Sequence, residues 1–177
     1  MPSKQFKECL TSIYFGEQEG EAAMETLVPV AANAHQQYAL GTLLQFETEG
    51  KARLRPLLSR LGMTVAQDPD ARTNGTALAQ SIAQAPLKEQ FGMMAAGVEA
   101  EFLEKYRELA RLITPEEDAG AYEIAKFMGD HEEAIMLATA NLANDAADPL
   151  APVVNLLQFP LVEPVGFGAD TLWDAGA

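Results

Sequence analysis

The sequence predicts an all-α protein made of four long amphipathic helices followed by an irregular tail. Apolar residues recur at the i, i+3, i+4, i+7 spacing of one helix face in four long stretches. Prolines at four positions after residue 148 forbid a fifth long helix. We therefore expect a helical bundle over residues 1–148 and a C-terminal segment over residues 149–177. The clearest apolar stripe consists of Leu40, Leu43, Leu44, Leu54, Leu57, Leu58 and Leu61.

The composition favours a soluble, cytoplasmic protein. A chain of 177 residues with 48% hydrophobic residues suits one domain with its own core. No apolar run approaches the roughly 20 residues needed to cross a bilayer, and the N-terminus lacks the apolar core of a signal peptide. The net charge of -14 argues against nucleic acid and membranes as partners. Cys9 is the only cysteine, which excludes an internal disulfide and a multi-cysteine zinc site.

Start and stop signals set the bounds of the first two helices. The first should run from an N-cap at Ser3 to about Val28. The second should begin near Asn33 and end at Leu61, where Gly62 supplies a C′ glycine. Because the link between them is short, the two helices should be antiparallel neighbours.

The second pair of helices follows a polar connection. Residues 63–75 carry turn signals, and residues 76–85 resemble a short helix that joins the two halves. The third long helix should open at Pro86 and run to about Ile113. Thr114, Pro115 and Glu117 supply an N-cap, a proline at N1 and a glutamate at N3, so the fourth helix has the clearest start. Two pairs joined by a crossover indicate a four-helix bundle.

The segment 149–177 is too apolar to be a solvated tail. It should pack on its own bundle or on a neighbouring subunit, and a homodimer with a strapped or exchanged tail is our hypothesis. The apolar side chains that support it are Val153, Val154, Leu156, Leu157, Phe159, Leu161, Val162, Phe167 and Trp173.

Acidic groups interrupt the apolar faces halfway along the helices. Glu47 fills the missing step of the leucine stripe, and a buried carboxylate needs a partner, a proton or a metal. Glu17, Glu101 and His131 occupy the middle of the other three helices, so all four should share one level of an antiparallel bundle. The separation of 30 residues between Glu17 and Glu47 recurs between Glu101 and His131, as in an internally duplicated bundle. Two further candidates adjoin these positions: Glu21 and Glu132.

Over about residues 5–144 the chain resembles the ferritin-like superfamily, in which helix pairs supply carboxylates and histidines to a di-iron or di-manganese centre. The resemblance is carried by residues 15–21, 45–50, 99–102 and 130–133. It implies an antiparallel four-helix bundle with a crossover between the second and third helices. It departs from the family's Glu-x-x-His motif, since Gly50 follows Glu47 and Ile135 follows Glu132 at that spacing. The implied metal ligands are drawn from Glu17, Glu21, Glu47, Glu101, His131 and Glu132.

Three interpretations remain open from the sequence. In the first, these residues bind iron or manganese, as one ion or two, in an oxidoreductase with Tyr14 or Tyr106 nearby and a small-molecule substrate that the sequence does not identify. In the second, no metal is bound and the buried Glu and His side chains form a hydrogen-bonded cluster, with Lys51, Arg53 or Lys105 as partners, in a binding module. In the third, the helical phases are off by one position and the acids point to water, or the chain has another all-α fold such as the haem-oxygenase-like bundle.

Some charged residues are expected at the surface. Glu49 and Arg53 are four residues apart on one helix and should form a surface pair. Glu19, Glu25 and Glu104 should face water. His35, at a helix start, should be exposed. His35 and His131 are the only two histidines, so a standard two-histidine centre is not expected.

Overall fold

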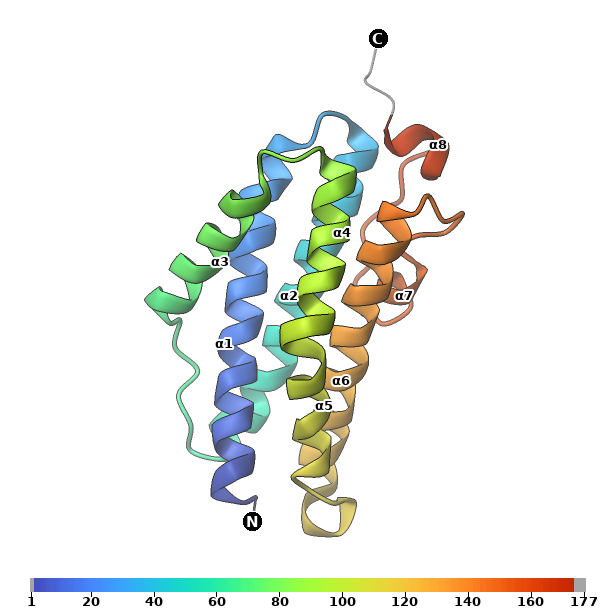
Figure 1. Cartoon of the computed structure of the whole chain (residues 1–177). Coiled ribbons are helices and arrows are strands. Elements are labelled where there is room, and N and C mark those ends of the chain that lie inside the picture. The colour runs from blue at the N-terminus through green and yellow to red at the C-terminus, as the bar shows by residue number, and fades with distance from the viewer. Residues whose placement is uncertain (1, 174–177) are drawn as a thin grey trace.

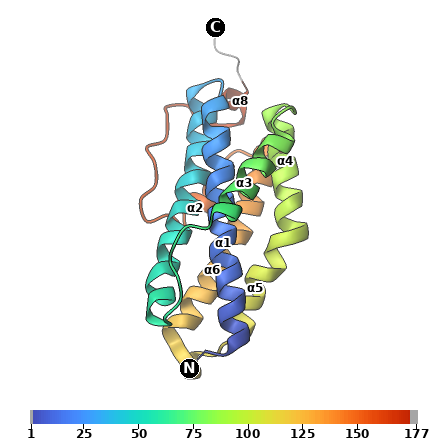
Figure 2. The same cartoon turned by 90° about the vertical axis from the view of Figure 1, so that its left-hand side faces the viewer.

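The computed structural model describes residues 2–173, apart from the side chain of Ala169, and this part of the chain is helical without any strand. Figures 1 and 2 show four helical rods side by side: α1, α2, a third rod formed by α4 and α5, and α6. The predicted all-α class is confirmed. The long helices span Lys4–Leu27 (α1), Ala34–Arg60 (α2) and Pro115–Ala143 (α6), and the shorter α4 and α5 span Leu87–Gly97 and Leu103–Arg111.

Side-chain caps begin the helices where the sequence predicts them. The Ser3 hydroxyl accepts a hydrogen bond from the Phe6 amide at the start of α1, and Asn33 accepts one from the Gln36 amide at the start of α2. A short 3-10 helix, Val28–Val30, joins the two. At the start of α6, Thr114 and Glu117 form a capping box. These starts are confirmed because each depends on hydrogen bonds within four residues of the cap.

The connecting helix α3, Pro69–Ile82, begins seven residues before the predicted start. Asp68 and Pro69, which suggested a turn, are instead an N-cap and a first-turn proline: the Asp68 carboxylate accepts from the amides of Asp70 and Ala71. Gly75 is inside the helix because α3 lies against α1 there, and a Cβ at this position would overlap the backbone of Glu19.

The predicted helix from Pro86 to Ile113 is interrupted. A π-helical turn, η2 (Val98–Phe102), separates α4 from α5. A π turn hydrogen-bonds at i→i+5 and holds more residues than an α turn, so it changes which side chains face inward. Glu99 and Glu101, both in this turn, are exposed. No proline or glycine lies within residues 98–102, so the sequence did not indicate this turn.

The apolar core forms two clusters separated by the level at which the buried acids lie. One cluster joins the C-terminal half of α1 and the N-terminal half of α2 to α4, α6 and the tail, and includes Leu40, Leu43, Phe46, Phe91 and Leu142. The other joins the opposite halves of α1 and α2 to α5 and the start of α6, and includes Phe6, Leu10, Leu54, Leu58 and Leu109. The mid-bundle acids thus have apolar packing both above and below them.

The C-terminal segment packs on α2 and α6 of its own chain. It contains two short helices, α7 (Ala151–Val154) and α8 (Ala169–Leu172), and buries Leu150, Val153 and Leu172. Part of it remains uncovered: the exposed fractions of Val162 and Val165 are 94% and 100%. The homodimer remains a prediction, since this is a single chain.

Two surface predictions are wrong because the tail covers their residues. Glu49 is buried, and its carboxylate accepts hydrogen bonds from the backbone amides of Gln158 (2.8 Å) and Phe159 (2.9 Å). The predicted pair with Arg53 does form, at 3.9 Å, but on a buried carboxylate and not at the surface. His35 is half-buried, with its ring edge-on to Phe167. Contacts made by residues more than 100 positions away leave no local trace in the sequence.

Between residues 2 and 173, no helix is long and apolar enough to span a membrane.

Candidate metal centre

Three buried side chains from α1 and α6 offer ligand atoms to one point. Glu17, His131 and Glu132 each have a carboxylate oxygen or imidazole nitrogen within 4.8 Å of the others. The exposed fractions of Glu17 and His131 are both 0%, and that of Glu132 is 5%. Oε2 of Glu17 lies 3.6 Å from Nε2 of His131. Two carboxylates and one imidazole are side chains that commonly bind transition metals in proteins.

Hydrogen bonds and ring stacking hold Glu17 and His131 in place but leave one buried polar atom of each without a partner among the described residues. The Tyr106 hydroxyl donates to Oε1 of Glu17 at 2.9 Å. The His131 ring stacks on Phe46 with 4.0 Å between centroids, and its Nε2 lies 3.2 Å from the Phe46 carbonyl oxygen. Within the described residues, Oε2 of Glu17 and Nδ1 of His131 have no hydrogen-bond partner although both are buried. Buried polar atoms without partners are uncommon and costly, so these two require an explanation.

Two glycines make room for the glutamates, in a reciprocal arrangement of α1 and α2. A Cβ at Gly50 would overlap Oε2 of Glu17 and lie 2.7 Å from Nε2 of His131. A Cβ at Gly20 would overlap the carboxylate of Glu47. Each helix therefore carries Glu-x-x-Gly, and the glutamate of one helix fills the space left by the glycine of the other. The departure from Glu-x-x-His at Gly50 is visible in the sequence, whereas the only sequence signal of this pairing is the repeated motif.

Burial makes ionisation of these carboxyl groups unfavourable. The pKa values of Glu17 and Glu47 are raised well above their usual range, mainly by burial and then by nearby carboxylates. Burial raises the pKa of Glu132 to about 8 and lowers the pKa of His131 to about 4. Without a metal, Glu132 therefore holds a proton at neutral pH and the imidazole of His131 is neutral, while the raised pKa values of Glu17 and Glu47 favour their protonated forms.

The other predicted ligands are distributed unequally around this group. Glu47 is buried and electrostatically coupled to Glu17 and Glu132, although it is not one of the three residues with converging ligand atoms. Glu21 is buried but already paired: it forms an ion pair with Lys51 and accepts a hydrogen bond from Thr48. Its carboxylate is thus neutralised outside the three-residue group.

Glu101 is the second predicted ligand outside the group. The π turn leaves it exposed, and it contributes instead to the lining of a neighbouring pocket. Of the two tyrosines expected nearby, Tyr106 contacts Glu17, whereas the Tyr14 hydroxyl donates to the Val65 carbonyl, away from the group. Arg53 lies over the Phe127 ring and pairs with Glu49, not with an acid of this group.

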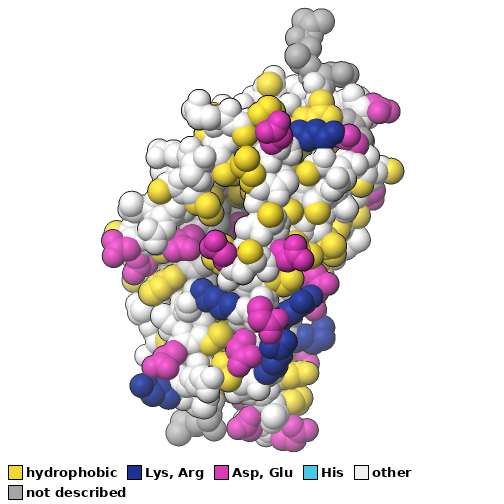
Figure 3. Space-filling model, viewed as in Figure 1, with side chains coloured by type: hydrophobic (Ala, Val, Ile, Leu, Met, Phe, Trp, Pro, Cys, Tyr) yellow, Lys and Arg dark blue, Asp and Glu magenta, His cyan; other side chains and the backbone are white. Residues whose placement is uncertain are grey.

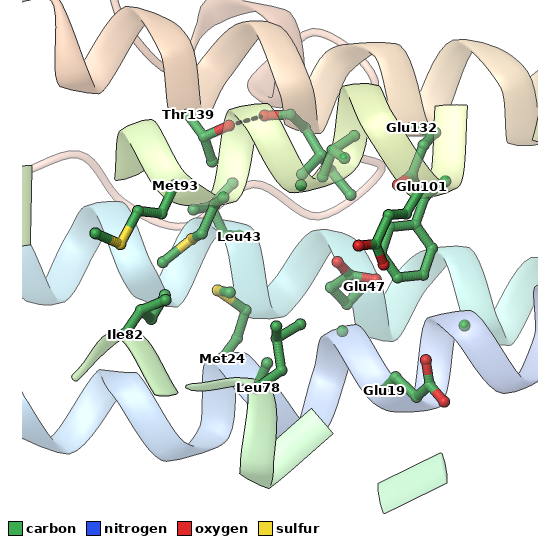
Figure 4. A pocket seen from close by; sticks show the side chains of 18 of the residues that line it. Glu19, Met24, Leu43, Glu47, Leu78, Ile82, Met93, Glu101, Glu132 and Thr139 are labelled. Atoms are coloured by element: carbon green, nitrogen blue, oxygen red, sulfur yellow. Dashed lines mark hydrogen bonds between the residues drawn. The ribbon is translucent and has the colours of Figure 1, made fainter. Parts of the chain in front are cut away.

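A pocket of about 170 Å³ adjoins the carboxylates between α1, α3, α4 and α6. Glu47, Glu101 and Glu132 gather at one end of it, and apolar side chains such as Met24, Ile82 and Met93 form the other end (Figure 4). The pocket gives the buried acids a neighbouring space that a small molecule could enter.

No protein-family model matches the chain, and the searches of curated proteins and of solved structures give no match either. The ferritin-like resemblance therefore depends on the residues themselves and remains a prediction.

Proposed function

We propose that this chain is a ferritin-like metalloprotein that binds iron or manganese at Glu17, His131 and Glu132, with Glu47 as a further ligand, and acts as an oxidoreductase. The observation that carries the proposal is the pair of buried atoms without partners, one on Glu17 and one on His131, beside a third converging ligand. A divalent ion at this group would bind the unpartnered Oε2 of Glu17 and would offset the repulsion between the carboxylates.

The donor set fits the proposed metals. Carboxylate oxygens with one imidazole suit iron and manganese, and this group contains no thiolate. When bound, such an ion supplies one-electron and oxygen chemistry that side chains alone do not provide.

The residues around the group would position the ligands and exclude water. Tyr106 orients Glu17 through its hydrogen bond, and Phe46 fixes the plane of the His131 ring by stacking. Such supporting contacts tune metal affinity. The apolar clusters above and below the group keep solvent away from it.

The path of the chain supports the ferritin-like assignment. In Figure 1, α1 and α6 run upward, whereas α2 and the rod of α4 and α5 run downward. The segment between α2 and α4 must therefore return along the length of the bundle, and it includes α3. One crossover between the second and third rods is the connection expected of ferritin-like folds.

A metal-free binding module is the second candidate, and one observation favours it. The raised pKa values of Glu17, Glu47 and Glu132 mean that protons alone can neutralise the group. The buried residues would then stabilise the fold and line a binding pocket, with no redox role.

Elemental analysis separates the two candidates. Protein purified without a histidine tag, after growth with iron and manganese, should carry one or two equivalents of metal. Glu17→Ala and His131→Ala should lose the metal, while the control Glu101→Gln, which changes an exposed carboxylate outside the group, should keep it. Circular dichroism would verify that each variant is folded. Absence of metal, repeated after anaerobic reconstitution with ferrous iron, would contradict the proposal and leave the metal-free module.

A further inference from the structure

The pocket beside the acids has the size of a small organic ligand. Its volume of about 170 Å³ is close to that of an engineered protein cavity of about 150 Å³ that binds benzene. A molecule of roughly six to eight non-hydrogen atoms would fill such a space.

The pocket is lined by acidic side chains and by no basic side chain among the described residues. Glu19, Glu47, Glu101 and Glu132 contribute to its walls, and within the described residues no lysine, arginine or histidine does. A ligand carboxylate or phosphate would therefore meet repulsion without a compensating cation. A ligand cation would find carboxylates at one end, together with the aromatic rings of Phe102 and Tyr106, which also line the pocket and attract cations.

The other end of the pocket is apolar and reaches the surface. Met24, Ile82 and Met94 line it, and Leu78 and Met93, with exposed fractions of 51% and 48%, mark where it opens between α3 and α4. Hydrophobic side chains gather between these two helices on the face seen in Figure 3. Exposed apolar side chains around a hollow are typical of ligand-binding sites.

We propose that this pocket binds a small primary amine with an apolar tail of about six carbons, whose ammonium group contacts Glu47 and Glu101 and whose tail packs against the methionines. Charge selects the head group and the apolar wall selects the tail. The inference does not require a metal, because every group that it uses belongs to the chain itself. The amine and the proposed metal would both use Glu47, so the inference concerns the metal-free protein and does not depend on the metal.

Calorimetry on metal-free protein at low salt tests the charge preference. Hexylamine, 1-hexanol and hexanoate share one tail and differ in head group. We expect hexylamine to bind at least tenfold more tightly than hexanol, and hexanoate not to bind. Affinity should rise by about fourfold for each methylene between butylamine and hexylamine. Hexanoate binding as tightly as hexylamine, or hexylamine no tighter than hexanol, would overturn the proposal.

The location of the amine needs a separate measurement, because a chain with a net charge of -14 attracts ammonium ions to its whole surface. In protein labelled at the methionine methyl groups, hexylamine should shift the NMR signals of Met24, Met93 and Met94. The signals of Met63 and Met128, which belong to the other apolar cluster, should stay unchanged. Shifts spread evenly over all five would show surface binding and contradict the pocket.

A matched pair of variants tests the head-group contact. Glu101→Gln should weaken hexylamine binding at least threefold and leave hexanol unaffected. Glu99→Gln removes another exposed carboxylate of the same π turn that does not line the pocket, and should change neither affinity. Equal effects of the two variants, or none at Glu101, would refute the proposed contact. Since all of these assays use metal-free protein, their outcome is independent of whether the metal proposal succeeds.

Discussion

The pairing of Glu17 with Gly50 can be tested by adding one methyl group. Gly50→Ala places a Cβ where Oε2 of Glu17 lies and 2.7 Å from Nε2 of His131. In a helix interior, alanine is otherwise more favourable than glycine by about 1 kcal/mol. Overpacking a well-filled core costs about 1–3 kcal/mol, and the two atoms met here belong to buried, constrained side chains, so the upper part of that range applies. We therefore expect a net destabilisation of about 1–2 kcal/mol.

Urea denaturation of metal-free protein, followed by circular dichroism, gives the free energy of unfolding. In a separate thermal denaturation, the melting temperature of Gly50→Ala should fall by roughly 2 to 8 °C relative to the native protein. Gly92→Ala is the matched control: it lies inside α4, and its Cβ would meet only Ala143, at an ordinary 3.7 Å. That variant should be more stable than the native protein by about 0.5–1 kcal/mol.

Repeating the substitution in the Glu17→Ala variant tests whether its cost comes from the contact with Glu17. Glu17→Ala removes the carboxylate that the new Cβ would meet, so adding Gly50→Ala to it should cost much less than in the native chain. The coupling free energy of such a cycle for residues in contact is about 0.5–3 kcal/mol. If Gly50→Ala stabilised the native chain as much as Gly92→Ala does, or cost the same in both backgrounds, the reciprocal packing of α1 and α2 would be refuted.

Three further predictions follow from the same side chains. Metal-free Glu17→Gln should be more stable than the native protein at pH 8, because its neutral amide replaces a carboxyl group whose raised pKa makes ionisation costly; equal urea midpoints would contradict this. The affinity for Mn²⁺ should rise from pH 6 to about 8, and calorimetry should show proton release on binding. The reason is that Glu132 holds a proton below its pKa of about 8, whereas His131, with a pKa of about 4, stays neutral. An affinity independent of pH would contradict this prediction. Glu49→Ala should cost about 1.5–3 kcal/mol and speed proteolysis near Phe159, because two backbone amides lose a charged acceptor; unchanged cleavage would show that the tail is held elsewhere.

The features that the sequence could predict are local ones. The caps at Ser3, Asn33 and Thr114 depend on neighbouring residues, so the starts of α1, α2 and α6 are right. Helical periodicity also predicted that Glu17 and His131 face inward, because each lies on an otherwise apolar stripe and both are fully buried.

The features that it could not predict depend on distant contacts or on a change of helical phase. The sequence suggests Lys51 among the possible partners of the buried acids, but spacing within one helix could not assign it to Glu21 of α1. The amides that bury Glu49 come from the tail, and spacing within one helix carries no sign of them. The sequence did not predict the π turn because the turn changes the helical phase. It rotates the residues after Val98 relative to a continuous α-helix, and Glu101, which α periodicity places beside the apolar face, is exposed.

One electrostatic property of the buried group underlies both of its candidate functions. Glu17, Glu47 and Glu132 repel one another when ionised, and burial makes each charge costlier. Neutralising them requires either protons or a divalent ion, and the same repulsion that raises the affinity for protons raises the affinity for metal. Occupancy at a given pH is then a competition between the two. Measuring metal affinity together with proton release shows which of them this group holds at neutral pH.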